Sequence, residues 1–230
     1  MKKIGFIGAF DKTDYIIYVA RLLTLAGKKV ILIDSTVNQK AKYIIPAVMP
    51  IRSYVTEYQK FDVSVGFYGF GSIEEYLYID NIENSYDVAL IDIDSPEVFA
   101  NFDMEYADIN YFVTSFDMFS LRKGLEAISG LKEITKFKKV LLARDTIKQD
   151  NDYLNFLSEN LKVMWDDEII CFKPNQMDTN IMIENQRSAI LNFKSLSPDY
   201  LGNILQITEE IGDKNSNELK KILKSNEKGV

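Results

Sequence analysis

Residues 4–13 read Ile-Gly-Phe-Ile-Gly-Ala-Phe-Asp-Lys-Thr, and residues 27–34 read Gly-Lys-Lys-Val-Ile-Leu-Ile-Asp. The stretch 13–26 between them carries apolar side chains on nearly every face, as a helix packed against a sheet does. A short apolar strand, a polar loop, a buried helix and a second apolar strand together are typical of the opening unit of a nucleotide-binding α/β domain. This unit decides the fold class.

The loop after the first strand has fewer glycines than a phosphate-binding loop requires. Such a loop uses glycines so that successive backbone N–H groups can point inward at phosphate. Here only Gly8 remains, and Lys12 and Thr13 end a shortened loop. Phe10 adds bulk where the backbone must approach phosphate. Asp11 adds a negative charge, and like charges about 4 Å apart cost a few kcal/mol near a protein surface. We therefore expect nucleotide binding to be weakened or lost.

The composition limits the classes of function. The chain has 230 residues, a net charge of −7, no histidine and one cysteine. The acidic balance argues against nucleic acid as the main partner, because phosphate binding needs a basic surface. The lack of histidine excludes Ser-His and Cys-His mechanisms and histidine-ligated metals. Because there is no signal-peptide pattern and no apolar run long enough to span a bilayer, we expect a cytoplasmic protein.

Further short apolar runs and periodic segments predict the rest of the fold. We expect strands at 62–66, 88–92, 111–114, 140–143 and 168–172, and helices at 72–78, 120–134, 152–161 and 198–211. Asp14 and Ser72 are expected to cap their helices. Strands alternating with helices predict a single-domain, doubly wound, mainly parallel sheet with helices on both faces. We place this domain at 1–212, followed by a polar linker and a short basic tail at 213–230.

Three segments support a more specific interpretation. They are KTDYIIYVARLLTLAGKKVILID (12–34), YDVALIDIDSP (86–96) and ADINYFVTSFDMFSLRKGLEAI (107–128). In order and spacing they resemble the MinD/ParA family of deviant P-loop ATPases. The first resembles that family's Lys-Thr pair, first helix and second strand, and the second resembles its Walker B strand. The third is similar to the strand and helix that follow. The resemblance covers most of the chain and implies a P-loop NTPase-like fold.

The resemblance also implies site residues. If nucleotide binds, Gly8, Lys12 and Thr13 are the nucleotide-binding residues, and Thr13 and Asp92 are the Mg²⁺ residues, with Asp94 beside them. Asp34 matches the first aspartate of a pair that orients the attacking water.

The departures from the family pattern concern the same site. The family loop reads roughly Lys-Gly-Gly-x-Gly-Lys-Thr, whereas this loop is two residues shorter. It lacks the first lysine, which in the family contacts the nucleotide of the partner subunit. Thr36 stands where a second aspartate is expected. We therefore expect a degenerate Walker A loop without efficient hydrolysis; no cofactor is certain, and ATP with Mg²⁺ stays open.

Two apolar regions are candidates for contact with protein partners. The segment 43–58 and the aromatic loop at 67–71 fall where the family has its switch region and dimer face. The partner-face candidates are Tyr43, Ile44, Ile45, Phe67, Tyr68 and Phe70; the alternative is that these residues complete the core.

The tail 218–225 is a candidate for contact with a membrane. It places Leu219, Ile222 and Leu223 on one helical side and lysines on the other. This resembles the C-terminal membrane-targeting helix of MinD-type proteins; the alternative is a frayed terminus, because so short a helix is marginal alone.

Our leading interpretation is a non-canonical MinD/ParA-like protein with a degenerate nucleotide site. It would act as a positioning or scaffold homodimer for a membrane-associated pilus, secretion or conjugation assembly. It would reside in the cytoplasm or at the inner face of the membrane. One alternative is an active but atypical Mg-ATP-dependent switch ATPase. A DNA-partitioning protein is the second alternative, which the net acidity disfavours.

Overall fold

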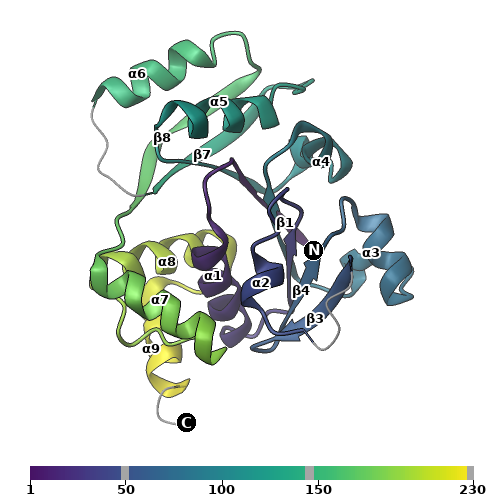
Figure 1. Ribbon diagram of the computed structural model, residues 1–230, viewed down its shortest axis with the longest axis vertical. Coiled ribbons are helices and arrows are strands. Elements are labelled where there is room, and N and C mark those ends of the chain that lie inside the picture. The colour runs from purple at the N-terminus through teal and green to yellow at the C-terminus, as the bar shows by residue number, and fades with distance from the viewer. Residues whose placement is uncertain (48–51, 143–147, 227–230) are drawn as a thin grey trace.

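The computed structural model describes residues 1–47, 52–142 and 148–226, and within these ranges eight strands form one sheet in the order β3-β4-β2-β5-β1-β6-β7-β8 (Figure 1). The strands are β1 (Lys2–Ile7), β2 (Val30–Asp34), β3 (Tyr54–Tyr58), β4 (Phe61–Val65), β5 (Val88–Ile93), β6 (Ile109–Thr114), β7 (Thr135–Leu142) and β8 (Val163–Phe172). Neighbouring strands run parallel, except that β3 and β4 form an antiparallel hairpin at one edge. This architecture confirms the predicted doubly wound, mainly parallel α/β fold.

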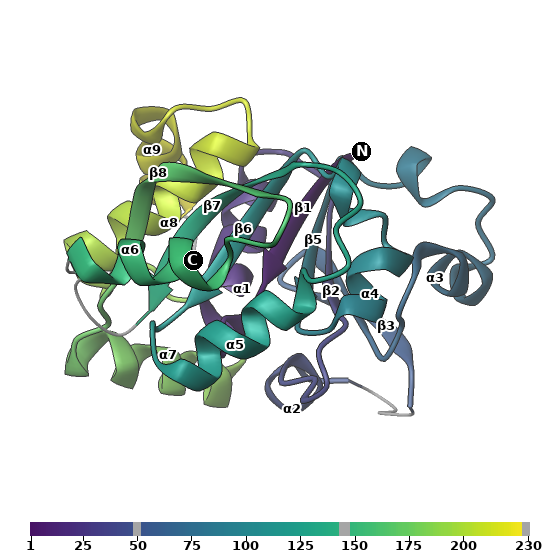
Figure 2. The ribbon, with the colours of Figure 1, turned by 90° about the horizontal axis from the view of Figure 1, so that it is seen from above.

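Helices cover both faces of the sheet. They are α1 (Thr13–Leu25), α2 (Ala41–Ile44), α3 (Phe70–Leu77), α4 (Pro96–Asn101), α5 (Met118–Ala127), α6 (Lys148–Leu157), α7 (Gln176–Ser188), α8 (Pro198–Ile211) and α9 (Ser216–Asn226), with short 3₁₀ helices η1 (Ile82–Asn84) and η2 (Met104–Tyr106). Helices α1, α8 and α9 pack on one face, and α3, α4 and α5 pack on the other (Figure 2). Each face therefore has its own apolar core.

The central strands are buried because both of their faces are covered. Every residue of β2 and β5 is buried, and these strands are continuous apolar runs that end at or near an aspartate. Such runs are typical of parallel strands covered by helices on both sides. Helix α1 is buried along most of its length and ends before Gly27, whose φ of +95° suits the turn after a helix. The sequence predicted these central elements correctly.

Strand β3 and helices α2, α4 and α7 were not predicted from the sequence. Helix α7 is polar, and among its residues only Asp178 and Asn185 are buried, so that it shows no apolar periodicity. It begins with a reciprocal capping box between Asn175 and Asp178. The hairpin β3–β4 turns at Gln59 and Lys60, which both have positive φ although neither is glycine. The usual turn residues are therefore missing from this hairpin.

Several predicted boundaries and caps were wrong. Helix α5 runs over Met118–Ala127 instead of 120–134, and β7 begins at Thr135, before the predicted start at residue 140. Residue 143, which we placed at the end of that strand, lies outside the described residues. Asp14 does not cap α1; instead the backbone N–H of Thr13 donates to the carboxylate of Asp11 at 3.2 Å. Ser72 lies inside α3, which begins at Phe70, and its hydroxyl donates to the carbonyl of Gly69 at 2.8 Å.

The C-terminal tail forms helix α9 and packs against α8 and α1. Leu219 and Leu223 are 1% and 6% exposed, and Ile222 packs beside them at the edge of the same core. The proposed membrane-facing side of the tail therefore faces its own domain, which corrects the membrane assignment of these three residues. Among the described residues, no helix is both long and apolar enough to cross a membrane.

We expect the Leu219→Ala variant to lose about 2–4 kcal/mol of unfolding free energy, because it removes a buried side chain from a packed core. Urea unfolding measures this loss. The control is Lys220→Ala, since Lys220 is exposed on α9 and its replacement should change stability by less than about 0.5 kcal/mol. Equal stability of the two variants would contradict the packing of α9.

Candidate functional site

A hollow of about 310 Å³ lies where the polypeptide leaves the C-terminal ends of β1, β2 and β5. Ligands of parallel α/β sheets bind at this edge, next to a point where the strand order reverses. Its walls are formed by the loop 8–13, by Thr36, Asn38, Lys40 and Tyr43, and by Asp92 and Asp94. The fold therefore brings Gly8, Lys12, Thr13 and Asp92 together, as the sequence predicted.

A buried ion pair occupies the centre of this site. The Lys12 ammonium nitrogen Nζ lies 2.6 Å from Asp92 Oδ1, and the two side chains are only 2% and 3% exposed. The same nitrogen donates a hydrogen bond to the carbonyl of Gly8 at 2.6 Å. Burial raises the pKa of Asp92 to about 7, against the opposing effect of the Lys12 charge. The lysine that would hold phosphate is thus engaged inside the protein.

Both residues predicted to hold Mg²⁺, Thr13 and Asp92, line the hollow, but Asp92 is engaged by the protein in this arrangement. The Asp92 carboxylate is paired with the Lys12 ammonium group, and the nearby carboxylates of Asp34 and Asp94 add to the rise of its pKa. Within the described residues, no group of three or more acidic, cysteine or histidine side chains is placed to hold a metal. Thr13 is buried beside the loop and adds at most one hydroxyl oxygen. Direct binding of Mg²⁺ by this Asp92 oxygen would require the pair with Lys12 to open.

Asp34 makes structural contacts at the end of β2. Its Oδ1 accepts hydrogen bonds from the hydroxyl and backbone N–H of Thr36, at 2.6 and 3.2 Å. Its Oδ2 accepts from the backbone N–H of Ala41 at 2.9 Å, and Asp34 is not among the residues that line the hollow. Both carboxylate oxygens thus hold the loop between β2 and α2, and the role of Asp34 in orienting water stays a prediction.

Lys40 belongs to the site, although sequence analysis did not find it. Its ammonium nitrogen lies 2.5 Å from Asp11 Oδ2 and 2.6 Å from Asp14 Oδ2. Burial lowers the pKa of Lys40, but the carboxylates of Asp14 and Asp11 raise it by more. The charge of Asp11, which we expected to repel phosphate, is therefore partly offset, because Lys40 shares one positive charge between two carboxylates. The acidic residues Asp11 and Asp14 indicated that a positively charged side chain would lie nearby. No motif in the sequence indicated that this residue is Lys40.

The loop before α1 retains unused backbone donors. In the described part of the chain, the backbone N–H groups of Ala9, Phe10, Asp11 and Lys12 donate no hydrogen bond. They belong to the wall of the hollow and precede the N-terminus of α1, where a helix dipole favours anions. This part of a phosphate site is present, whereas the lysine is engaged elsewhere.

The residues predicted to form a partner face fall into three groups. Tyr43 is 79% exposed and Tyr68 is 47% exposed. Ile45 is 3% exposed and packs in the core, which corrects its assignment, whereas Phe67 is 7% exposed, with most of its ring in the core and the rest at a surface hollow. The remaining two pack partly against the core, namely Ile44 and Phe70, and the Phe70 ring lies 4.9 Å from that of Phe102.

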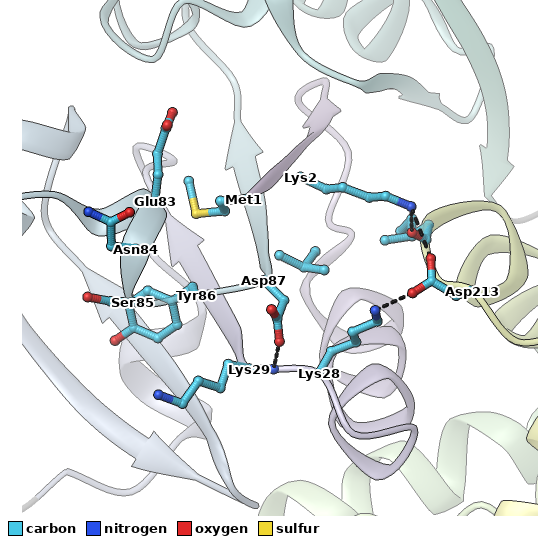
Figure 3. Close-up of a pocket in the computed structure, with 12 residues that line it drawn as sticks. Met1, Lys2, Lys28, Lys29, Glu83, Asn84, Ser85, Tyr86, Asp87 and Asp213 are labelled. Atoms are coloured by element: carbon cyan, nitrogen blue, oxygen red, sulfur yellow. Dashed lines mark hydrogen bonds and ion pairs between the residues drawn. The ribbon is translucent and has the colours of Figure 1, made fainter.

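A second hollow, of about 410 Å³, lies at the opposite edge of the sheet (Figure 3). Lys2 and Lys28 both pair there with Asp213, which fixes the turn between α8 and α9. Asp87 accepts a hydrogen bond from the backbone N–H of Lys29 at 2.8 Å. The charges of Lys2, Lys28 and Asp213 in this hollow are paired with one another. The hollow lies at the N-terminal ends of the strands, whereas ligands of parallel α/β sheets bind at the C-terminal ends. We therefore place the functional site at the smaller hollow.

Comparison with solved structures identifies the fold. No protein-family model matches the chain, and a search of curated proteins gives no significant match. The MinD cell division protein of Aquifex aeolicus matches with a TM-score of 0.54 at 14% identity, over 91% of this chain and 97% of that one. This chain has the MinD/ParA-type P-loop ATPase fold.

Two other structures with the MinD/ParA fold match over similar lengths. A variant of McdA from Cyanothece, in complex with ATP, matches with a TM-score of 0.55 at 12% identity, over 94% of this chain and 98% of that one. A ParA family ATPase of Chlorobium tepidum matches with a TM-score of 0.51 at 13% identity, over 90% and 98%. At this identity the likeness shows the MinD/ParA fold, and the function of the site has to be argued from its residues.

Proposed function

We propose that this protein is a MinD/ParA-type positioning or scaffold protein that has given up efficient ATP hydrolysis. The observation that supports this proposal most strongly is the buried pair of Lys12 with Asp92. A nucleotide would have to separate these charges before Lys12 could reach phosphate. Breaking a buried pair is costly, because each ion loses its compensating charge in a poorly solvated place.

In this proposal the protein acts as a homodimer in the cytoplasm, at the inner face of the membrane. It would position a membrane-associated assembly of the pilus, secretion or conjugation type. A domain that catalyses no reaction acts through the partners that bind to its surface. Tyr43 and Tyr68 are exposed and available for such contacts. Because the apolar side of α9 is buried, attachment to the assembly would use protein contacts.

An alternative function is an atypical Mg-ATP-dependent switch ATPase. The four unpaired N–H groups of residues 9–12 favour it, because they are the donors that a phosphate group needs. It requires Lys12 to leave Asp92 when nucleotide enters.

A DNA-partitioning function has less support. Strand β7 carries three lysines, of which Lys136 pairs with Asp166 and Lys138 pairs with Glu210. Lys139 donates to the side chain of Asn151 at 3.0 Å. The two ion pairs offset part of the positive charge that a DNA backbone would require.

Calorimetric titration with ATP and Mg²⁺ tests the proposed function. We expect no binding heat at about 1 mM ATP, because separating Lys12 from Asp92 costs much of the binding free energy. A dissociation constant above about 1 mM corresponds to less than about 4 kcal/mol of binding free energy. The matched variants are Lys12→Ala and, as a control far from the hollow, Lys220→Ala. Micromolar binding that is lost in Lys12→Ala and kept in Lys220→Ala would overturn the proposal in favour of the switch ATPase.

A further inference from the structure

An open hollow of about 790 Å³ lies between the β4–α3 loop and helix α3. It is lined by Phe67, Tyr68, Tyr76, Tyr78 and Glu75, together with small residues. We call it the tyrosine hollow. It lies at the end of the molecule that carries α3, away from α6, α7 and α8 (Figures 1 and 2).

Tyr78 is presented to solvent at a conformational cost. It is the residue that ends α3, it has a φ of +54° and it is 96% exposed. Glycine is the usual residue in this left-handed position, because a Cβ atom is crowded there. A bulky aromatic residue that gains no burial and accepts this strain has no evident role in folding. Its presence points to a contact outside the chain.

The other tyrosines are held in place by the protein. The Tyr76 ring packs edge-on against Phe67, with ring centroids 5.3 Å apart. The Tyr68 hydroxyl accepts a hydrogen bond from the side-chain amide of Gln39 at 2.9 Å. Gln39 lies between Asn38 and Lys40, which line the hollow of about 310 Å³ at the C-terminal ends of β1, β2 and β5. This hydrogen bond therefore connects the tyrosine hollow to the loop that forms the wall of that site. Both rings are therefore oriented before any partner arrives.

The chemistry of the tyrosine hollow favours a cation. Tyrosine faces carry negative electrostatic potential and attract ammonium and guanidinium groups. Glu75 supplies a negative charge, and among the described residues no lysine or arginine lines the hollow. The chain as a whole also has a net charge of −7. Three tyrosine rings and one carboxylate without a cation complement a positively charged side chain.

We propose that the tyrosine hollow binds an arginine- or lysine-bearing segment of a partner protein. The inference names a partner chemistry for the proposed scaffold, and rests on that function for its biological meaning. Its physical test uses no nucleotide. If the peptide does not bind to the tyrosine hollow, the scaffold proposal still stands. If ATP binds and the scaffold proposal fails, the peptide can still bind to the tyrosine hollow.

The experiment is an NMR titration of the full chain with a capped tetra-arginine peptide, at about 0.15 M salt to screen general attraction. A few cation–π contacts support binding near the millimolar range, so the titration runs to about 5 mM. We expect saturable shifts confined to the backbone amides of residues 67–78. Capped tetra-glutamine is expected to cause none.

The decisive variant is Tyr78→Gly, which leaves the net charge unchanged and relieves the strained backbone. It should unfold at a slightly higher urea concentration than wild type and bind tetra-arginine about fivefold more weakly, as loss of one cation–π contact predicts. The matched control is Tyr153→Ala on α6, which should bind like wild type. The proposal would be overturned if Tyr78→Gly bound tetra-arginine as tightly as wild type, or if wild type showed no saturable binding. It would also be overturned if Tyr153→Ala bound the peptide as weakly as Tyr78→Gly.

Discussion

The Lys12→Ala variant is expected to unfold at pH 8 with a free energy about 3–5 kcal/mol below that of wild type. Removing the ammonium group leaves the Asp92 carboxylate buried, only 3% exposed, without its counter-ion. The carbonyl of Gly8 loses its 2.6 Å donor at the same time. Urea unfolding at pH 8 measures the loss from the shift of the midpoint.

This loss is expected to shrink as the pH falls. Burial raises the pKa of Asp92 to about 7 in wild type, and without the opposing charge of Lys12 it should rise further. The folded variant then keeps a proton that the unfolded chain, with an Asp pKa of about 3.9, releases. The contribution of Asp92 to the variant's stability is therefore fully present below the unfolded pKa of about 3.9 and is lost as the pH rises through the folded pKa. The difference between Lys12→Ala and wild type should be smaller at pH 5 than at pH 8.

The control is the double variant Lys12→Met/Asp92→Asn, which removes both charges and keeps similar volumes. Replacing both members of a buried ion pair is often neutral, whereas removing one is costly. We therefore expect the double variant to be more stable than Lys12→Ala at pH 8. If Lys12→Ala matched wild type there, the pair would not exist in solution and the proposed function would lose its main support.

The sequence predicted those elements whose boundaries have a local physical cause. Helix α8 begins at Pro198 after the cap Ser197 and ends at Ile211 before Gly212, so both ends are signalled by single residues. The buried strands β2 and β5 are apolar runs that end at or near an aspartate. Local propensity, apolar pattern and end signals agree in these elements, and the prediction succeeded for that reason.

The contacts that define the state of the site could not be predicted, because they join residues far apart in the sequence. The partner of Lys12 is 80 positions away in the chain, and Lys40 reaches Asp11 and Asp14 through a loop with no periodic pattern. The sequence correctly placed Lys12 and Asp92 at one edge of the sheet, since β1 and β5 are neighbours. It could not show that they neutralise each other.

The Gly8→Ala variant is expected to lose about 4 kcal/mol or more of unfolding free energy. Gly8 has a φ of +147°, and an added Cβ would lie 2.1 Å from the carbonyl oxygen of Val113 on β6. A strained φ alone costs about 1–3 kcal/mol, and a backbone oxygen of a central strand cannot move aside as a flexible side chain can. Thermal and urea unfolding of the nucleotide-free protein measure the effect.

The control Gly202→Ala separates this clash from a general effect of replacing glycine. Gly202 lies inside α8 with nothing within 4 Å of the added Cβ, so the change should stabilise the helix by about 0.5–1 kcal/mol. A Gly8→Ala protein as stable as wild type would show that β1 and β6 do not approach as closely as described. The expected loss means that the sheet requires glycine at this position whether or not the loop binds phosphate. A glycine retained in the loop is then no evidence of nucleotide binding, and the diagnostic residue is Lys12.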